Sequence, residues 1–201
     1  MPTHTLIHPQ HGGVSPESDA KTVFGFWVYL MTDLVLFATL FATYAVLRNN
    51  TYGGEAGHEL FQLPFVLTET LILLTSSFTC GLAMLAHRTN NRQQTLAWLA
   101  VTLLLGLSFL TMEVTEFHKL IGEGNGYQRS AFLSSFFTLI GTHGLHITVG
   151  CLWIIALMVE TLMRGLNARS VSKFLAFSLF WHFLDIVWIF IFTIVYLMGA
   201  M

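Results

Sequence analysis

Five acidic residues lie within long apolar stretches of this 201-residue chain, where a charge needs a partner. They are Asp33, Glu69, Glu113, Glu116 and Asp185. All nine lysine and arginine residues fall outside those stretches, so no fixed positive charge can pair with the acids at depth. Burying an unpaired carboxylate in a low dielectric is costly. We therefore expect each acid to be protonated, hydrated, or matched by a histidine or a hydroxyl group.

Three histidines lie deep within the same apolar stretches. His143 and His146 are three residues apart, as are His182 and Asp185, and this spacing puts the members of each pair on one face of a helix. A metal site is one interpretation, but three deep histidines are too few for a histidine-box oxygenase, and the paired Glu-x-x-His motifs of diiron bundles are missing. A structural role, in which histidines bond buried acids, is favoured over metal binding. A proton relay is a third interpretation, favoured less than the structural role and more than metal binding.

The composition is typical of a membrane protein. Apolar residues make up 54% of the chain and charged residues 10%, against roughly 25% in a soluble domain. Five apolar runs are each long enough, as helices, to cross a hydrocarbon core of about 30 Å. We predict an all-α polytopic membrane protein, a bundle of five transmembrane helices that span approximately 24–47, 65–86, 96–118, 131–159 and 174–199.

The remaining features restrict the function further. Residues 1–23 are predicted to be a mobile polar N-terminal tail, in which His4, His8 and His11 are polar filler rather than metal ligands, and residues 24–201 a single transmembrane domain. A net charge of -2 leaves no basic surface for nucleic acid. Cys80 and Cys151 both lie in apolar runs and read as buried side chains without a disulfide.

The basic residues also predict the orientation of the chain. With five spans, one side of the membrane carries six of them, Lys21, Arg88, Arg92, Arg164, Arg169 and Lys173. The other side carries three, Arg48, Lys119 and Arg129. Because basic residues near spans are retained inside, we expect a cytoplasmic N-terminus and a periplasmic C-terminus.

Helical projection predicts which polar residues meet. At 100° per residue Asp185 shares a stripe with Ser178, His182 and Tyr196, and this stripe is expected to face inward. In the fourth span, Gly141, Gly144 and Thr148 form a small-residue face suited to close helix contact.

Counting depth along each helix predicts two layers of polar residues. At about 1.5 Å per residue, Asp33, His182 and Asp185 lie roughly 14, 12 and 16 Å deep, whereas Glu69, Glu113 and Glu116 form a layer nearer the outer side. We predict that Asp33 pairs with a histidine of the fourth or last helix. Glu69 should lie closer to Glu113 or Glu116 than to Asp185.

Two motifs resemble subunit III of the haem-copper respiratory oxidases. They are WHFLDIVWIF at residues 181–190 and HGLH at residues 143–146, accompanied by Glu116-Phe117. The resemblance is closest to the cytochrome bo-type ubiquinol oxidase and extends from Phe24 to Met201. Longer relatives have two extra N-terminal helices that form a lipid-holding cleft, and this chain lacks them.

The resemblance implies a non-catalytic subunit without haem or copper of its own, and an enzyme complex in a bacterial inner membrane that oxidises ubiquinol, reduces oxygen to water and pumps protons. Haem and copper would reside in the catalytic subunit I, which this chain would support together with its proton uptake. Phospholipid would be a further partner.

The resemblance also bears on single residues. Asp33 takes the place of the family's buried acid, Glu116 matches the acid before an aromatic, and Glu69 belongs to the quinol-oxidase variant. The expected buried polar network is structural and consists of Asp33, Glu69, Glu113, Glu116, His143, His146, His182 and Asp185. The alternative hypothesis is an independent small membrane transporter with a buried acid and histidine proton relay.

Overall fold

The computed structural model describes residues 16–51, 62–166 and 168–199, which form five long helices. Their order is α1 (Pro16–Leu47), α3 (Leu63–Arg88), α4 (Arg92–Gly122), α5 (Ala131–Arg164) and α6 (Ala168–Ile191), and α6 continues into the π-helical turn η1 (Phe192–Leu197). All five are long and apolar enough to cross a membrane. This confirms the predicted all-α bundle of five transmembrane helices.

Four of the five helices begin before the apolar runs that predicted them, and three end after them. The largest difference is in α1, which starts at Pro16 rather than at residue 24, so the end of the predicted polar tail is helical. Proline suits the first turn of a helix because its fixed φ is already helical and its missing N–H would have no partner there. His4, His8 and His11 lie outside the described residues, and the mobility of the tail stays a prediction.

Local sequence signals set the ends of the other helices. The side chains of Asn91 and Ser130 accept hydrogen bonds from the backbone N–H groups of Gln94 and Leu133, which cap α4 and α5. Gly165 ends α5 with a φ of 69°, a left-handed conformation that glycine adopts without steric cost.

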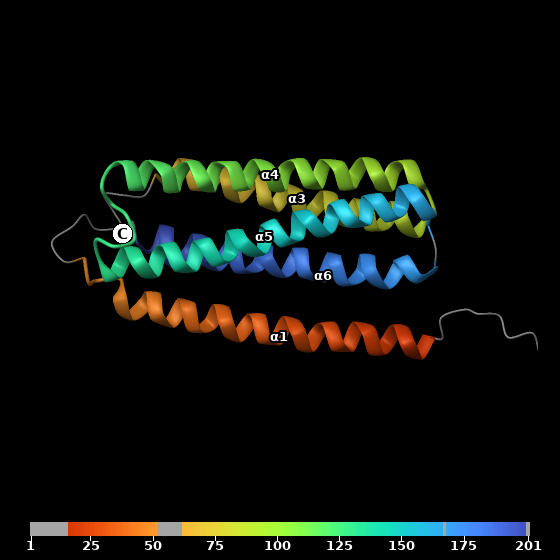
Figure 1. Ribbon diagram of the computed structural model, residues 1–201, viewed down its shortest axis with the longest axis horizontal. Helices are drawn as coiled ribbons and strands as arrows, with labels where there is room; N and C mark the ends of the chain where they lie inside the picture. The colour runs from red at the N-terminus through yellow and green to blue at the C-terminus, as the bar shows by residue number, and fades with distance from the viewer. Residues whose placement is uncertain (1–15, 52–61, 167, 200–201) are drawn as a thin grey trace, which may run out of the picture.

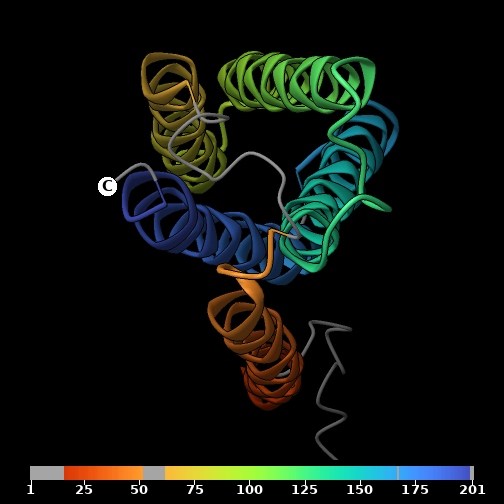
Figure 2. The same cartoon turned by 90° about the vertical axis from the view of Figure 1, so that its left-hand side faces the viewer.

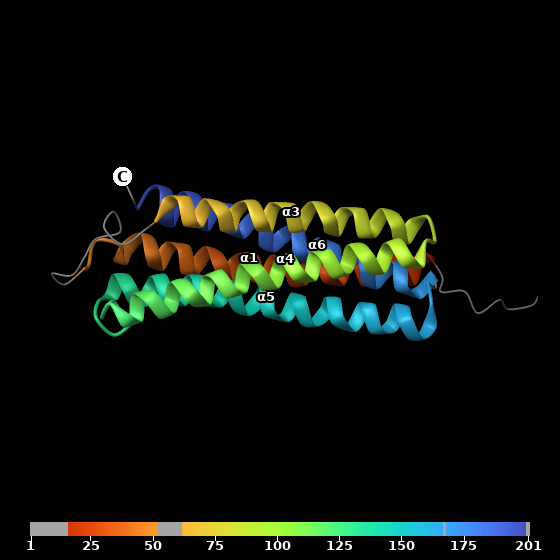
Figure 3. The same ribbon diagram turned by 90° about the horizontal axis from the view of Figure 1, so that it is seen from above.

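The helices lie side by side along the length of the molecule (Figures 1 and 3). Seen end on, α3, α4, α5 and α6 surround a shared interior, and we call these four helices the core bundle (Figure 2). α1 lies outside the core bundle and contacts α5 and α6. In the most apolar stretch of α1, 22% of the residues are buried, against 56% in that of the last span. α1 therefore leaves most of its surface open to lipid or to another protein.

Trp181 of α6 lies in a narrow slot between two glycines of the core bundle. A methyl group on Gly150 of α5 would come 2.6 Å from a carbon of the indole ring, and one on Gly106 of α4 would come 3.0 Å from it. Membrane helices approach closely where small residues let them, since no hydrophobic effect drives one helix onto another in lipid. The slot therefore fixes the position of α6 against α4 and α5.

Candidate functional site

The first buried acid lies at the seam between α1 and α5. Nε2 of His146 is 3.8 Å from Oδ2 of Asp33, and both side chains are largely buried. This contact confirms the predicted pairing of Asp33 with a histidine of the fourth or last helix. The ring of Phe37 covers it, with its centroid 5.2 Å from that of His146.

A hydrogen bond within α5 orients the ring of His146 toward Asp33. Nδ1 of His146 lies 2.7 Å from the carbonyl oxygen of Thr142, and because a carbonyl only accepts, Nδ1 carries a proton. Nε2 then faces Oδ2 of Asp33 across 3.8 Å, which is too long for a hydrogen bond, and Oδ2 has no hydrogen-bond partner among the described residues. The contact between the two side chains is therefore electrostatic.

A second group of acids lies between α3 and α4, beside η1 at the end of the last span. The side chain of Glu69 is fully buried, and Glu116 and Glu113 are the acidic neighbours that act on it electrostatically. Tyr196 of η1 donates a hydrogen bond of 2.9 Å to Oε2 of Glu116. Glu69 is thus grouped with Glu113 and Glu116, as predicted.

Glu113 reaches across from α4 to α5. A methyl group on Gly144 would come 2.5 Å from its Oε1, so the carboxyl group of Glu113 lies directly against the backbone of α5. This supports the predicted use of Gly144 in close helix contact. Within the described part of the chain, Oε2 of Glu113 and both carboxyl oxygens of Glu69 have no hydrogen-bond partner. A protonated, neutral acid is the form that tolerates such a place.

The third acid, Asp185, lies apart from the other two groups. Its neighbours are Ser77 of α3 and His182, one turn earlier on α6. His182 is itself exposed on this chain, so the structure does not place it on a buried, inward-facing stripe as predicted. The predicted stripe of Asp185 with Tyr196 is wrong, because Tyr196 packs among Trp188, Phe136 and Glu116 in the interior. The reason is the π-helical turn, which has more residues per turn than an α-helix and rotates Tyr196 away from Asp185.

His143 occupies the centre of the molecule. It is fully buried, and its ring is surrounded by those of Phe37, Phe109 and Trp188, with centroids 5.3 to 6.3 Å away. Neither ring nitrogen has a hydrogen-bond partner among the described residues. Ring faces remain as weak acceptors for its N–H group.

The eight predicted site residues thus form separate small groups. Asp33 and His146 form one, Asp185 and His182 a second, and the three glutamates a third, with His143 alone among rings. Nowhere in residues 16–51, 62–166 and 168–199 do three His, Cys, Asp or Glu side chains gather so that they could hold a metal ion. The arrangement is suited to holding helices together at defined depths.

Two hydroxyl groups of α3 accept hydrogen bonds from indole groups of the last span, a role that sequence analysis did not predict. Ser76 accepts a hydrogen bond of 3.1 Å from the indole N–H of Trp181, and Thr70 accepts one of 3.0 Å from that of Trp188. The seven-residue spacing of the two tryptophans, opposite two hydroxyls six residues apart on an apolar helix, is the signal that could have revealed them.

Comparison with known proteins adds to this geometry. A family model described as "Cytochrome c oxidase subunit III" matches residues 11–200. The chain is 60% identical to "Cytochrome bo(3) ubiquinol oxidase subunit 3" of Pseudomonas aeruginosa over 92% of this chain and 88% of that protein. It is 45% identical to "Quinol oxidase subunit 3" of Bacillus subtilis, over 96% and 98%. It is 48% identical to "Cytochrome c oxidase subunit 3" of Bacillus sp. (strain PS3), over 87% and 84%.

Proposed function

Since the chain belongs to the cytochrome c oxidase subunit III family, we propose that it is the third subunit of a terminal oxidase that oxidises ubiquinol and reduces oxygen to water. The observation that carries this proposal is the 60% identity to a protein named as subunit 3 of a bo(3) ubiquinol oxidase. Two relatives named for a bo(3) ubiquinol oxidase are 60% and 54% identical over 92% of this chain, against 48% over 87% for a relative named for cytochrome c, which favours a quinol as the electron donor.

The role of this subunit is support rather than redox chemistry. The haem and copper of the complex belong to the catalytic subunit I, and this chain packs against that subunit and sustains its proton uptake. The wide apolar surface of α1 supports such packing, because residues including Phe24, Val35 and Val46 are strongly exposed on it. Phospholipid covers the surface that other subunits leave open.

The subunit lies in the bacterial inner membrane with its N-terminus in the cytoplasm and its C-terminus in the periplasm. The helix bounds support this orientation, since Arg88 and Arg92 flank the same end of the bundle as Arg164 and Lys173. A reporter enzyme fused to the C-terminus should be exported to the periplasm. One inserted in the loop from Arg164 to Lys173 should be retained in the cytoplasm. The reverse pattern would show that the orientation is wrong.

Co-purification is the decisive experiment for the proposed function. The chain is tagged, its membranes are solubilised in a mild detergent, and the haem and ubiquinol oxidase activity that remain with it are measured. We expect both in constant ratio to the tagged chain. A chain that purifies alone and transports a solute in vesicles would instead support the transporter hypothesis, which the comparisons do not favour.

A further inference from the structure

His182 is an exposed polar side chain near the middle of the last membrane span. The span has 28 residues, Ser170–Leu197, and is about 42 Å long as a helix. In a hydrocarbon core of about 30 Å, roughly 6 Å of the span extends beyond each surface, and His182 lies about 12 Å below the nearer surface. At this depth, water and lipid headgroups are too far away to bond to its ring.

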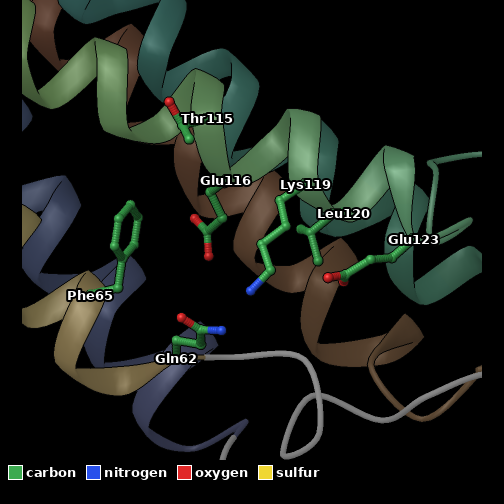
Figure 4. A pocket seen from close by; sticks show the side chains of 7 residues that line it. All are labelled: Gln62, Phe65, Thr115, Glu116, Lys119, Leu120 and Glu123. Atoms are coloured by element: carbon green, nitrogen blue, oxygen red, sulfur yellow. The ribbon is translucent and has the colours of Figure 1, made fainter.

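Exposed polar side chains elsewhere on the chain find partners in two ways. Lys119 and Gln62, which line the pocket shown in Figure 4, are exposed near helix ends, where water can bond to them. The hydroxyl groups of Thr75 and Ser108 are exposed within spans, and each donates to a carbonyl of its own helix. A histidine ring has two nitrogens, and a bond to its own helix uses only one of them.

The hydrogen bond of His182 leaves its second nitrogen as an acceptor. Nδ1 lies 2.7 Å from the carbonyl oxygen of Ser178, and because a carbonyl only accepts, Nδ1 carries a proton. In the neutral ring, Nε2 then has a lone pair, and no hydrogen bond from the described residues reaches it. Asp185 does not supply a donor, since within the described ranges no hydrogen bond or ion pair joins it to His182. An unpaired acceptor in hydrocarbon is costly.

Three apolar side chains continue the exposed face of α6 on which His182 lies. Ile186 and Phe190 follow His182 at intervals of one turn, and Ile189 lies beside them. All three are exposed, at 54%, 53% and 41%, so no described helix covers them. We call His182, Ile186, Ile189 and Phe190 the α6 strip.

α3 and α1 contact α6 on the two sides of the α6 strip. On one side, Ser77 of α3 is the neighbour of Asp185, and the next residue, Phe78, is exposed. On the other side, the ring of Phe41 on α1 contacts that of Phe190, with centroids 6.4 Å apart. The two flanking helices stand apart from each other (Figure 2), so a further helix can lie along the strip between them.

The polar contacts inside this chain show what kind of group pairs with an acceptor at depth. Trp181 and Trp188 donate their indole N–H groups to hydroxyl groups of α3, and Tyr196 donates its O–H to a carboxyl group of α4. In each case a neutral donor on one helix meets an acceptor on the next, and in lipid such contacts help decide which faces meet. A charged donor is less suitable because it would itself have to be buried in hydrocarbon.

A second copy of the chain does not provide such a donor. In a dimer with its twofold axis along the membrane normal, the α6 strip of one copy would meet that of the other at the same depth. Nε2 of His182 would then face an identical acceptor, and Ile186, Ile189 and Phe190 have no side-chain donor. The complementary surface therefore belongs to a different chain.

We propose that the α6 strip is the contact surface for a membrane-spanning helix of another oxidase subunit, which donates a hydrogen bond from a neutral side chain to Nε2 of His182. The inference rests on the proposed function, in which this chain is one subunit of a complex, and it adds a surface and the chemistry of its partner. A hydroxyl, carboxamide or indole group meets the requirement.

The first test compares how firmly variants of His182 stay in the whole oxidase, which is purified through a tag on this chain. Haem that remains with the tagged chain is followed over time in detergent. If a donor faces Nε2, His182→Leu should release the haem-containing partner about fivefold faster than the wild type. If lipid faces it, the same variant removes a polar group from hydrocarbon and should be released no faster.

Two further variants show whether the acceptor itself matters. His182→Gln places a carboxamide oxygen near the position of Nε2 and should be released at nearly the wild-type rate. His118→Leu removes an exposed histidine near the end of α4, away from the α6 strip, and is the matched control. It should leave the rate unchanged.

The second test identifies what lies on the α6 strip in intact membranes. A photoreactive benzophenone side chain is placed at Ile186, and the adducts are digested and sequenced by mass spectrometry. We expect an adduct with a membrane span of another subunit. The same group at Leu104, which is 64% exposed on α4, should not label that span.

The outcomes separate the two proposals. A wild-type chain that purifies without haem would contradict the proposed function. Full haem, together with His182→Leu that is released no faster than the wild type, would overturn the inference about the α6 strip alone. Adducts at Ile186 with lipid only, or with a second copy of this chain, would also overturn it.

Discussion

The core bundle and the seam along α1 are held together by different kinds of contact. In the core bundle, three side chains of the last span, Trp181, Trp188 and Tyr196, each donate a hydrogen bond to a neighbouring helix. Along the seam, α1 relies on aromatic ring contacts, the Asp33 to His146 ion pair, and a long hydrogen bond of 3.5 Å from Tyr44 to the carbonyl of Val195.

This difference indicates how specificity is distributed in a bundle surrounded by lipid. Apolar contacts between helices replace equally good contacts with acyl chains, so polar contacts and close approach decide which faces meet. The core bundle has several such determinants, and the seam has few. α1 therefore depends most on what covers its outer face, and mutations should affect the two regions unequally.

The largest effect is expected from Gly150→Ala in the core bundle. The added methyl group would lie 2.6 Å from the Trp181 ring, whose rigid indole is hydrogen-bonded to Ser76 and has no room to retreat. We expect a loss of about 3 kcal/mol in the free energy of unfolding. The measurement is thermal release of the chain from the haem-containing complex, followed by gel filtration. Gly81→Ala, which meets no atom within 4 Å, is the control and should not lower stability.

Asp33→Asn should have an intermediate effect at the seam. An amide still fills the space but removes the carboxyl group that faces Nε2 of His146, so we expect a loss of about 1.5 kcal/mol. Stability should fall more than the turnover of the complex that remains, and Asp185→Asn should behave in the same way. Full assembly with lost turnover in Asp33→Asn would contradict the structural role and would favour a proton path through this pair.

The smallest effect is expected from Tyr196→Phe. The ring keeps its contacts with Phe136 and Trp188, and the hydrogen bond to Glu116 is lost. We expect about 1 kcal/mol, measured in the same release assay. If this variant destabilises the complex more than Gly150→Ala, then the acid group and not the Trp181 slot organises the core bundle, and the comparison must be reversed.

The five spans and the partner of Asp33 could be predicted from sequence for a shared reason. Apolar length defines a membrane helix, and a constant rise per residue gives each side chain a depth, so residues at equal depth, such as Asp33 and His146, become candidate neighbours. Depth alone does not say which helices are adjacent. The slot around Trp181 was therefore not predictable, because it needs glycines of α4 and α5 to meet on the same side of α6.

Two other features depended on local geometry that the sequence does not display. The position of Tyr196 follows from a π-helical turn, and a fixed rotation of 100° per residue fails beyond Ile191. The second is the pocket between the start of α3 and the end of α4, which is lined by Gln62, Lys119 and Glu123. Its position depends on how the two helices are connected and packed, because these decide where α3 begins relative to the end of α4.

The hydroxyl groups of Thr70 and Ser76, which accept hydrogen bonds from the last span, also bear on how the chain inserts into the membrane. The last span leaves the ribosome after the others, so α3 must wait in the lipid without the two tryptophans. The hydroxyl group of Thr70 donates a hydrogen bond of 2.9 Å to the carbonyl of Val66 on its own helix, and this bond does not depend on the last span. A lone pair of the same oxygen accepts the N–H of Trp188. The hydroxyl hydrogen of Thr70 is thus bonded within its own helix before the last span arrives, and binding the indole requires no bond to be broken.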